Sequence, residues 1–217
     1  MRILDLFCGG GGAAAGYANV GWEVIGVDID PQPSYPFLMI RADWSQVSSS
    51  GFDAIHASPP CQPYSSAVSS RSSKWNDTLG KDEPALIEPL RAHLMASGLP
   101  YVIENVIGAP LEGFVLCGSM FGLDIPRHRI FETNVPMIAP LHPDCRGIAK
   151  RASERRGWDY RDMSVTGKGR HAGTSERWAE LLGITHPMRQ HDLKEAIPPA
   201  YTEWIGNQLR GAICDVA

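Results

Sequence analysis

The most constraining feature of the sequence is a glycine run between an apolar segment and an alanine-rich one. Residues 3–7 are mostly apolar, glycines occupy positions 9–12, and alanines occupy positions 13–15. Glycine permits a tight turn and close approach of the backbone to a ligand, whereas alanine favours a helix. A second apolar stretch, residues 23–28, ends at Asp28. This order predicts a strand, a glycine turn, a helix and a second strand whose closing acid binds a ribose hydroxyl of a nucleotide-like cofactor.

Strand and helix patterns alternate along the rest of the chain, so the sequence predicts an α/β fold with a parallel sheet covered on both faces. Further strands are expected at residues 37–40, 52–57, 101–106 and 125–131. Helices are expected at residues 84–97, with a kink at Pro89, at 176–182, and near the end of the chain through Leu209. Ligands of such sheets bind at the carboxyl ends of the strands.

The strand candidate at residues 52–57 leads into a stiff turn that carries a cysteine. Pro59 and Pro60 restrict their own φ angles and those of their predecessors, so Cys61 is held at a strand end. A rigid thiol beside a serine-rich segment that begins at Ser65 is typical of covalent catalysis under a closing lid. An ordinary turn with an incidental cysteine is the alternative interpretation.

Other polar residues are also expected at strand ends. Glu104 closes the 101–106 strand, where an unpaired buried carboxylate would be costly. Asp43 could accept a hydrogen bond from an adenine amino group while Trp44 supplies an apolar wall, although both could equally be ordinary loop residues. Arg127 and Arg129 would share one face of a strand, and this alternation could simply direct both into solvent.

Composition restricts the class of protein. The chain has 217 residues, enough for one good core and a small appendage, and its 43% hydrophobic and 20% charged content suits a soluble globular protein. No apolar run approaches the ~20 residues that would span a membrane. Five dispersed cysteines indicate free thiols in a reducing, cytoplasmic compartment. His142 and Cys145 lie close together in sequence, but no second ligand pair is evident, so no metal site is expected.

Charge is unevenly distributed along the chain. The net charge is −4, yet residues 146–170 contain eight basic residues against three acidic ones. Such a segment is consistent with contact to a polyphosphate, and a solvated loop explains it equally well.

Six motifs, in this order, resemble those of the cytosine carbon-5 DNA methyltransferases. They are DLFCGGGG (5–12), VDID (27–30), PPCQPYS (59–65), ENV (104–106), RHR (127–129) and IGN (205–207). The resemblance implies a Rossmann-like class I methyltransferase sheet with a small irregular target-recognition insert. The implied divisions are a catalytic and cofactor-binding domain at 1–132, a basic target-recognition region at 133–177, and C-terminal helices at 178–217.

The resemblance also implies the chemistry. Cys61 would be the thiolate that attacks carbon-6 of a cytosine flipped out of double-stranded DNA, and Glu104 would bind its exocyclic amine and ring nitrogen 3. Arg129 would hold the base carbonyl, with Arg127 helping to position that oxygen or the Cys61 loop. The implied cofactor is S-adenosylmethionine. Its implied contacts are Phe7, Gly9, Gly11, Asp28, Ile29, Asp43, Trp44 and Asn207.

Three departures from the family pattern stand out. Ile125 occupies a place that is usually glutamine, Asp28 one that is commonly glutamate, and the insert is far shorter than usual. The implied enzyme is a monomer of a bacterial or phage-infected cell, needing no metal and no membrane. A tRNA cytosine-5 methyltransferase, as in one branch of the family, and a catalytically silent DNA-binding relative are the alternatives.

Overall fold

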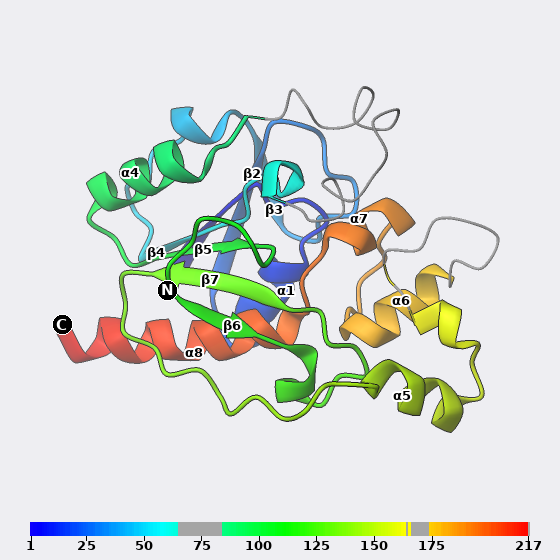
Figure 1. Ribbon diagram of the computed structural model, residues 1–217. Helices are drawn as coiled ribbons and strands as arrows, with labels where there is room; N and C mark the ends of the chain where they lie inside the picture. Colours follow the sequence, from blue (N-terminus) through cyan, green and yellow to red (C-terminus); the bar gives the residue numbers. More distant parts are fainter. Residues whose placement is uncertain (65–83, 164, 166–173, 217) are drawn as a thin grey trace.

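A single mixed sheet organises the computed structural model, which describes residues 1–64, 84–163, 165 and 174–216. Its strand order is β3-β2-β1-β4-β5-β7-β6 (Figure 1). The strands are β1 (Arg2–Leu6), β2 (Glu23–Asp28), β3 (Leu38–Arg41), β4 (Ala54–Ala57), β5 (Tyr101–Asn105), β6 (Phe114–Leu116) and β7 (Arg129–Thr133). Pairing is parallel from β3 through β5, whereas β7 runs antiparallel to both β5 and β6. The α/β prediction is therefore confirmed, and the prediction of a wholly parallel sheet is wrong at this edge.

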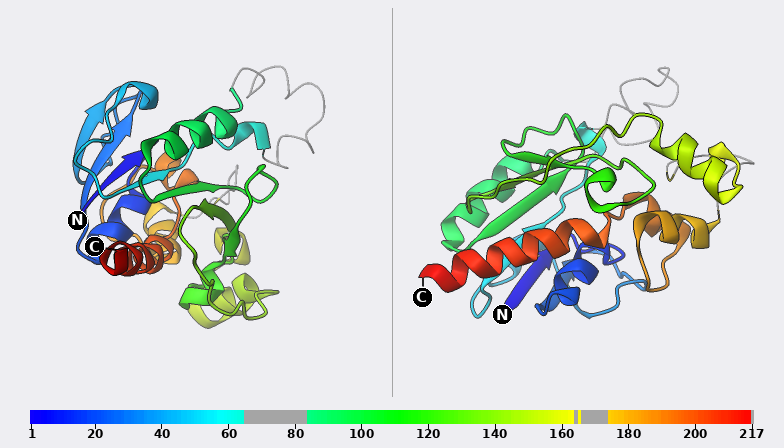
Figure 2. Two further views of the ribbon diagram at one scale, coloured as in Figure 1. Left: turned by 90° about the vertical axis from the view of Figure 1, so that its left-hand side faces the viewer. Right: turned by 90° about the horizontal axis from the view of Figure 1, so that it is seen from below.

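Helices cover both faces of the sheet. Figure 2 shows α8 on one side and α4 on the other, and α1 packs against α8. The helices are α1 (Gly12–Asn19), α4 (Ile87–Ser97), α5 (Ile148–Arg156), α6 (Ser175–Leu182), α7 (Gln190–Glu195) and α8 (Pro199–Val216). Strand alternation divides the core between them: Ile3 packs on the α1–α8 side and Leu4 on the α4 side. In the described part of the chain, no helix is long and apolar enough to cross a membrane.

Two local expectations are corrected by the structure. Helix α4 begins at Ile87, so Pro89 lies in its first turn, where a proline needs no hydrogen-bond partner and causes no kink. Strand β7 begins only at Arg129, and Arg127 has a left-handed φ of 40°. Arg127 and Arg129 therefore do not share a strand face, because the backbone turns between them.

A small third core lies beyond β7. Helix α5 falls within the segment that was expected to be irregular, and its Ala152 packs with Trp178 of α6 and Leu193 of α7. Ile125 is also buried there, which explains why an apolar residue suits that position. The expected boundary between 177 and 178 lies inside α6, so we propose that the unit built on this core runs from α5 to α7.

The basic segment is partly neutralised by ion pairs. Asp124 contacts both Arg155, at 2.5 Å, and Arg156, at 2.7 Å, and Arg156 also pairs with Glu180. Lys150 and Arg151 are exposed on α5. Residues 166–173 and the expected flap at 65–82, with Arg71, Lys74 and Lys81, lie outside the described residues.

Candidate active site

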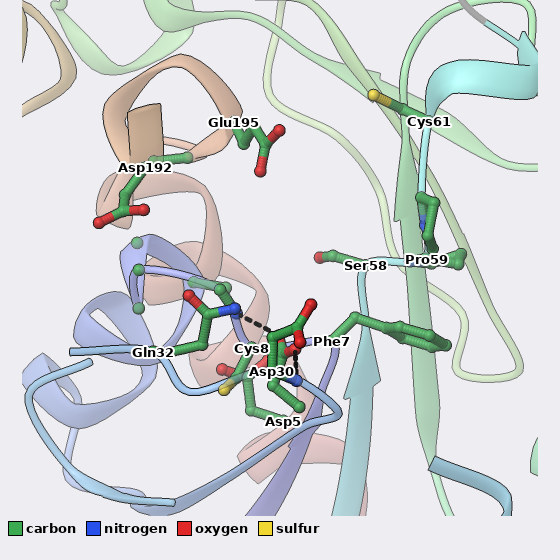
Figure 3. Close-up of a pocket in the computed structure, with 18 of the residues that line it drawn as sticks. Asp5, Phe7, Cys8, Asp30, Gln32, Ser58, Pro59, Cys61, Asp192 and Glu195 are labelled. Atoms are coloured by element: carbon green, nitrogen blue, oxygen red, sulfur yellow. Dashed lines mark hydrogen bonds between the residues drawn. The ribbon is translucent and has the colours of Figure 1, made fainter. Parts of the chain in front are cut away.

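A cavity of about 890 Å³ lies at the carboxyl ends of β1, β2, β4 and β5 (Figure 3). Such a volume suits a ligand of the size of a nucleotide-like cofactor together with part of a second substrate. Most of the residues that were expected to form the site line this cavity. They are Phe7, Gly9, Gly11, Asp28, Ile29, Asp43, Trp44, Cys61, Glu104 and Arg129.

The glycine turn and Asp28 form one end of the cavity. The carboxylate of Asp28 accepts hydrogen bonds from the backbone N–H of Gly9 at 3.2 Å and of Asp30 at 3.0 Å. Gly9 has a left-handed φ of 47°, and a Cβ there would meet no atom within 4 Å, so its face toward the cavity is open. Position 11 requires glycine for two reasons. Its φ of 86° is left-handed, and a Cβ there would lie 2.6 Å from the ring of Pro36.

An aromatic pair forms the adjoining wall. Phe7 has an unusual left-handed φ of 58°, and its ring lies 6.0 Å from that of Trp44, centre to centre. Asp43 uses one carboxylate oxygen to accept hydrogen bonds from the backbone N–H and hydroxyl of Ser45, capping the short 3₁₀ helix that carries Trp44. These bonds hold the pKa of Asp43 below its usual range. Asp43 therefore has a structural role in addition to its place on the cavity wall.

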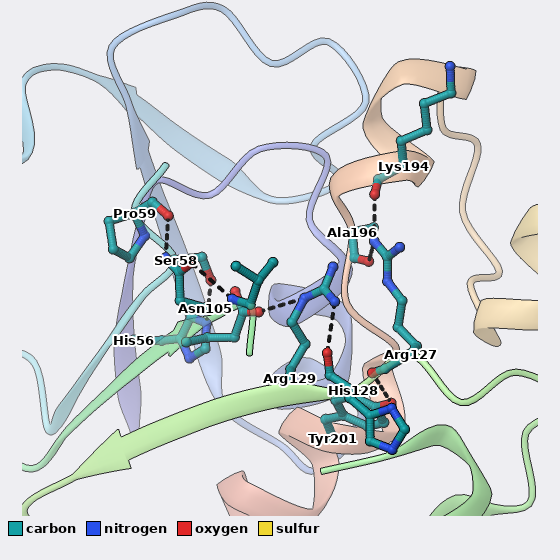
Figure 4. Close-up of polar contacts among 12 residues, drawn as sticks. His56, Ser58, Pro59, Asn105, Arg127, His128, Arg129, Lys194, Ala196 and Tyr201 are labelled. Carbon is teal, nitrogen blue, oxygen red and sulfur yellow. Dashed lines mark hydrogen bonds and ion pairs between the residues drawn. The ribbon is translucent and has the colours of Figure 1, made fainter. Parts of the chain in front are cut away.

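Cys61 occupies the other end, and its turn is tied to the end of β5. The side-chain amide of Asn105 donates to the carbonyl of Pro59 at 2.9 Å in a buried contact (Figure 4). The Glu104-Asn105-Val106 motif therefore helps to hold the proline turn that carries the Cys61 thiol. This hydrogen bond gives a physical reason why the two motifs occur in one chain.

Glu104 and Arg129 form a nearly buried ion pair beside Cys61. The Arg129 Nε to Glu104 Oε1 distance is 3.0 Å. Burial raises the pKa of Glu104, and the charge of Arg129 and a hydrogen bond from Ser58 oppose this rise. Oε1 of Glu104 is buried in this ion pair and retains the capacity to accept a further hydrogen bond.

A buried polar chain holds Glu104 from behind. His56 bridges the hydroxyls of Tyr17 and Ser58, with 3.0 Å to each, and Ser58 hydrogen-bonds to Glu104. Burial lowers the pKa of His56 to about 3, so this imidazole is neutral. A neutral bridge fixes the orientation of the carboxyl group without adding charge to it.

The surroundings of Cys61 favour the thiol over the thiolate. Burial raises its pKa, and the carboxylates of Glu104 and Glu195 raise it further, while Arg129 lowers it. Since the thiolate is the nucleophile, activation requires an added positive charge or a protonated Glu104.

Two expected site residues do not line the cavity. The buried guanidinium of Arg127 donates from Nη2 to the carbonyls of Lys194, at 2.5 Å, and Ala196, at 2.7 Å (Figure 4). Burial lowers the pKa of Arg127 to about 9. Asn207 is exposed on α8, roughly 12 Å along the helix axis from Pro199 at a rise of 1.5 Å per residue. Arg127 thus supports the end of α7, and Asn207 lies away from the cavity.

Other cavity residues were not anticipated. Ser58 directly follows β4, so its position at a strand end was a usable signal. Asp5 is buried on the cavity wall, and Glu195 faces the cavity from the end of α7 (Figure 3). No local pattern marks Glu195, because α7 reaches the cavity only through packing of the third core.

Comparisons with known proteins agree with this geometry. The sequence model for C-5 cytosine-specific DNA methylase matches residues 1–80. The N-terminal part of the chain is therefore similar to this family. No curated protein sequence matches the chain significantly. The 1–80 match covers the glycine turn, Asp28 and Cys61 but ends before Glu104 and Arg129.

Solved structures share the fold of this chain across nearly its whole length. A protein named as a DNA modification methyltransferase, encoded within an E. coli prophage, is 14% identical, with a TM-score of 0.62 and coverage of 99% of both chains. A DNMT2 mutant from Spodoptera frugiperda is 15% identical, with a TM-score of 0.58 over 96% of this chain and 99% of its own. Dnmt2 of S. pombe is 14% identical, with a TM-score of 0.58 over 97% of this chain and 98% of its own. At these identities the likeness is one of fold.

The matched family implies S-adenosylmethionine, and the cavity fits such a group. Asp5 Oδ1 is buried and has no hydrogen-bond partner among the described residues. Burial raises the pKa of Asp5 to about 7. A ligand that brings a donor or cation to Asp5 would satisfy this oxygen, and Asp28 presents a carboxylate suited to hydroxyl groups.

Proposed function

We propose that this protein is a DNA cytosine-5 methyltransferase that flips a cytosine out of the duplex and methylates it with S-adenosylmethionine. The observation that supports this best is the position of Cys61 beside the Glu104–Arg129 ion pair, at one end of a cavity whose other end holds Asp28. A cofactor end and a nucleophile end within one cavity provide what a two-substrate transfer requires.

The cofactor end would hold S-adenosylmethionine. Asp28 would bind the ribose hydroxyls, Gly9 and Gly11 would lie under the methionine part, and Phe7 would pack on the adenine. Ile29, Asp43 and Trp44 would complete the adenine wall. When bound, S-adenosylmethionine supplies the methyl group and a positive charge, which would also favour the Cys61 thiolate.

The nucleophile end would activate the base. A bond forms from the Cys61 sulfur to carbon-6 of cytosine, and the electrons of the 5,6 double bond move toward ring nitrogen 3 and the carbonyl oxygen. Glu104, whose pKa is raised by burial, donates a proton to nitrogen 3, and Arg129 stabilises the oxygen. Carbon-5 would take the methyl group as the carbon–sulfur bond of the cofactor breaks, leaving S-adenosylhomocysteine. A base then removes the carbon-5 proton, nitrogen 3 returns its proton to Glu104, and elimination releases the thiolate and methylcytosine.

Transfer of tritiated methyl from S-adenosylmethionine to duplex DNA and to tRNA tests this proposal. Cys61→Ala should abolish transfer to DNA, lowering the rate by about 10⁴-fold or more, since it removes the nucleophile. Cys214→Ala is a matched control, because Cys214 is an exposed thiol on α8. Cofactor binding by calorimetry confirms that the Cys61 variant is folded.

Each result assigns a different function. Cys61-dependent transfer to DNA supports the proposal, and transfer to tRNA alone would assign the protein to the RNA branch instead. Binding of DNA and cofactor without transfer to either polymer would identify a silent relative. Duplex DNA containing 5-fluorocytosine adds a direct readout, because a fluorine at carbon-5 blocks proton removal and should trap the covalent Cys61 adduct.

A further inference from the structure

Four potential metal ligands converge at a corner of the sheet outside the cavity. Cys117, His128, His142 and Cys145 each offer one ligand atom, and all four atoms lie within 4.8 Å of one another. The sequence predicted no metal because His142 and Cys145 lacked a second pair. The structure provides this pair as Cys117 and His128.

The antiparallel register explains how the hidden pair forms. Leu116 of β6 is paired with Arg129 of β7, so the next step along the two strands sets Cys117 opposite His128. Eleven positions separate these residues in sequence, and no motif spacing reveals their pairing. The second pair arrives on the segment after β7, which returns past the sheet toward α5 (Figure 1).

The distances suit a tetrahedral zinc ion. With Zn–S near 2.3 Å and Zn–N near 2.0–2.1 Å, neighbouring ligand atoms in a tetrahedron lie roughly 3.3–3.8 Å apart. Cys145 Sγ is 3.6 Å from His128 Nε2, and the His128 and His142 rings lie 5.3 Å apart at an angle of 89°. Perpendicular imidazoles are compatible with such a centre, and the longest separation, within 4.8 Å, would close by about 1 Å when the ion binds.

The environment also favours a metal over unligated thiols. The hydroxyl of Ser119 donates to Cys117 Sγ at 3.1 Å, the kind of outer hydrogen bond that supports a thiolate ligand. Residues 134–147 contain no helix, no strand and no buried side chain, and Ile138 and Leu141 are over 90% exposed. Val135, Met137 and Ala139 pack partly against the core, so apolar burial holds the start of this segment and contributes little from residue 140 onward.

We propose that Cys117, His128, His142 and Cys145 bind one structural Zn²⁺ that anchors residues 134–147 to the β6–β7 edge. Two thiolates and two imidazoles in a closed set are typical of a structural zinc site without an open position for catalysis. The ion also stabilises His128, whose carbonyl accepts a hydrogen bond from Arg129 at 2.9 Å. The zinc site and the Arg129–Glu104 pair are thus linked through adjacent residues, although the zinc site does not depend on the proposed methyl transfer.

Metal analysis of the purified full-length protein tests the site directly. We expect about one zinc per chain by mass spectrometry, and Co²⁺ exchanged into the site should show thiolate-to-cobalt charge transfer and the visible bands of a tetrahedral ion. His142→Ala and Cys145→Ser should each lower zinc occupancy at least tenfold. Cys214→Ser, which removes an exposed thiol elsewhere, should retain full occupancy.

The variants keep the test interpretable. Because His142 is exposed, its replacement leaves the packed core intact, and circular dichroism checks that the variant is folded. Protein that binds neither added Zn²⁺ nor Co²⁺ under reducing conditions would overturn the proposal. So would full zinc occupancy in both variants, or an intact mass showing a Cys117–Cys145 disulfide in freshly prepared protein.

Discussion

Two groups of polar side chains, the cavity rim formed by Asp28, Cys61 and Glu104 and the four-ligand corner described above, are encoded differently in the sequence. At the rim, each group lies at or just beyond the carboxyl end of a strand: Asp28 ends β2, Cys61 follows β4, and Glu104 lies near the end of β5. Parallel strands bring such ends together, so local motifs predict a shared site. At the corner, the antiparallel pairing of β6 with β7 and the segment after β7 bring the four ligands together. The spacing of these residues in the sequence does not predict that they meet.

The two regions meet in three consecutive residues. Arg129 faces Glu104 at the rim, His128 faces the corner, and Arg127 reaches the carbonyls at the end of α7. The left-handed φ of 40° at Arg127 makes this divergence possible. One motif therefore supports three neighbouring structures, and substitutions within and around it should separate catalysis from stability.

Glu104→Gln should have the largest effect on the rate among the rim variants compared below. Loss of the proton donor should lower kcat by about 10²–10⁴-fold. The same change should lower the pKa of the Cys61 thiol, because the carboxylate of Glu104 raises it. The pH dependence of iodoacetamide labelling measures this pKa, with Cys61→Ala identifying the background. Glu195→Gln should produce a smaller decrease, and an unchanged pKa in both variants would contradict the assigned electrostatics.

Asp28→Ala should weaken the cofactor end of the rim. Charged hydrogen bonds contribute about 1.5–3 kcal/mol, so the Kd for S-adenosylmethionine should rise roughly 10- to 100-fold by calorimetry. Asp28→Glu, which keeps the carboxylate that the family commonly places here, should restore most of the affinity. An unchanged Kd in Asp28→Ala would move the ribose contact elsewhere.

Arg127→Met should affect stability more than chemistry. Its guanidinium donates to two carbonyls at the end of α7, and leaving a buried acceptor unpaired costs about 1–3 kcal/mol. Urea denaturation should show this loss, while kcat falls less than tenfold. Arg129→Met should show the opposite pattern, with a rate loss of about 10²–10³-fold, because it contacts Glu104 at the cavity. Equal rate losses in the two variants would mean that Arg127 also takes part in catalysis.

The sequence predicted most of the sheet and most of the cavity, and its failures have physical causes. β2 has the predicted bounds, and Asp28, Cys61 and Glu104 lie where strand ends meet. β6 was missed because three residues are too short a pattern to recognise. Glu195 and the pairing of Cys117 with His128 depend on tertiary packing and register, which no single segment encodes.

Asn207→Ala should have the smallest effect and is the sharpest test of the rim's extent. The IGN motif implied that Asn207 contacts the cofactor, yet it is exposed on α8 and outside the cavity. The Kd for S-adenosylmethionine should therefore change by less than about twofold, since exposed substitutions away from such features are usually within ±0.5 kcal/mol. Calorimetry on this variant beside Asp28→Ala provides the comparison. A tenfold rise would mean that α8 approaches the bound cofactor, and the rim would then include the C-terminal helix.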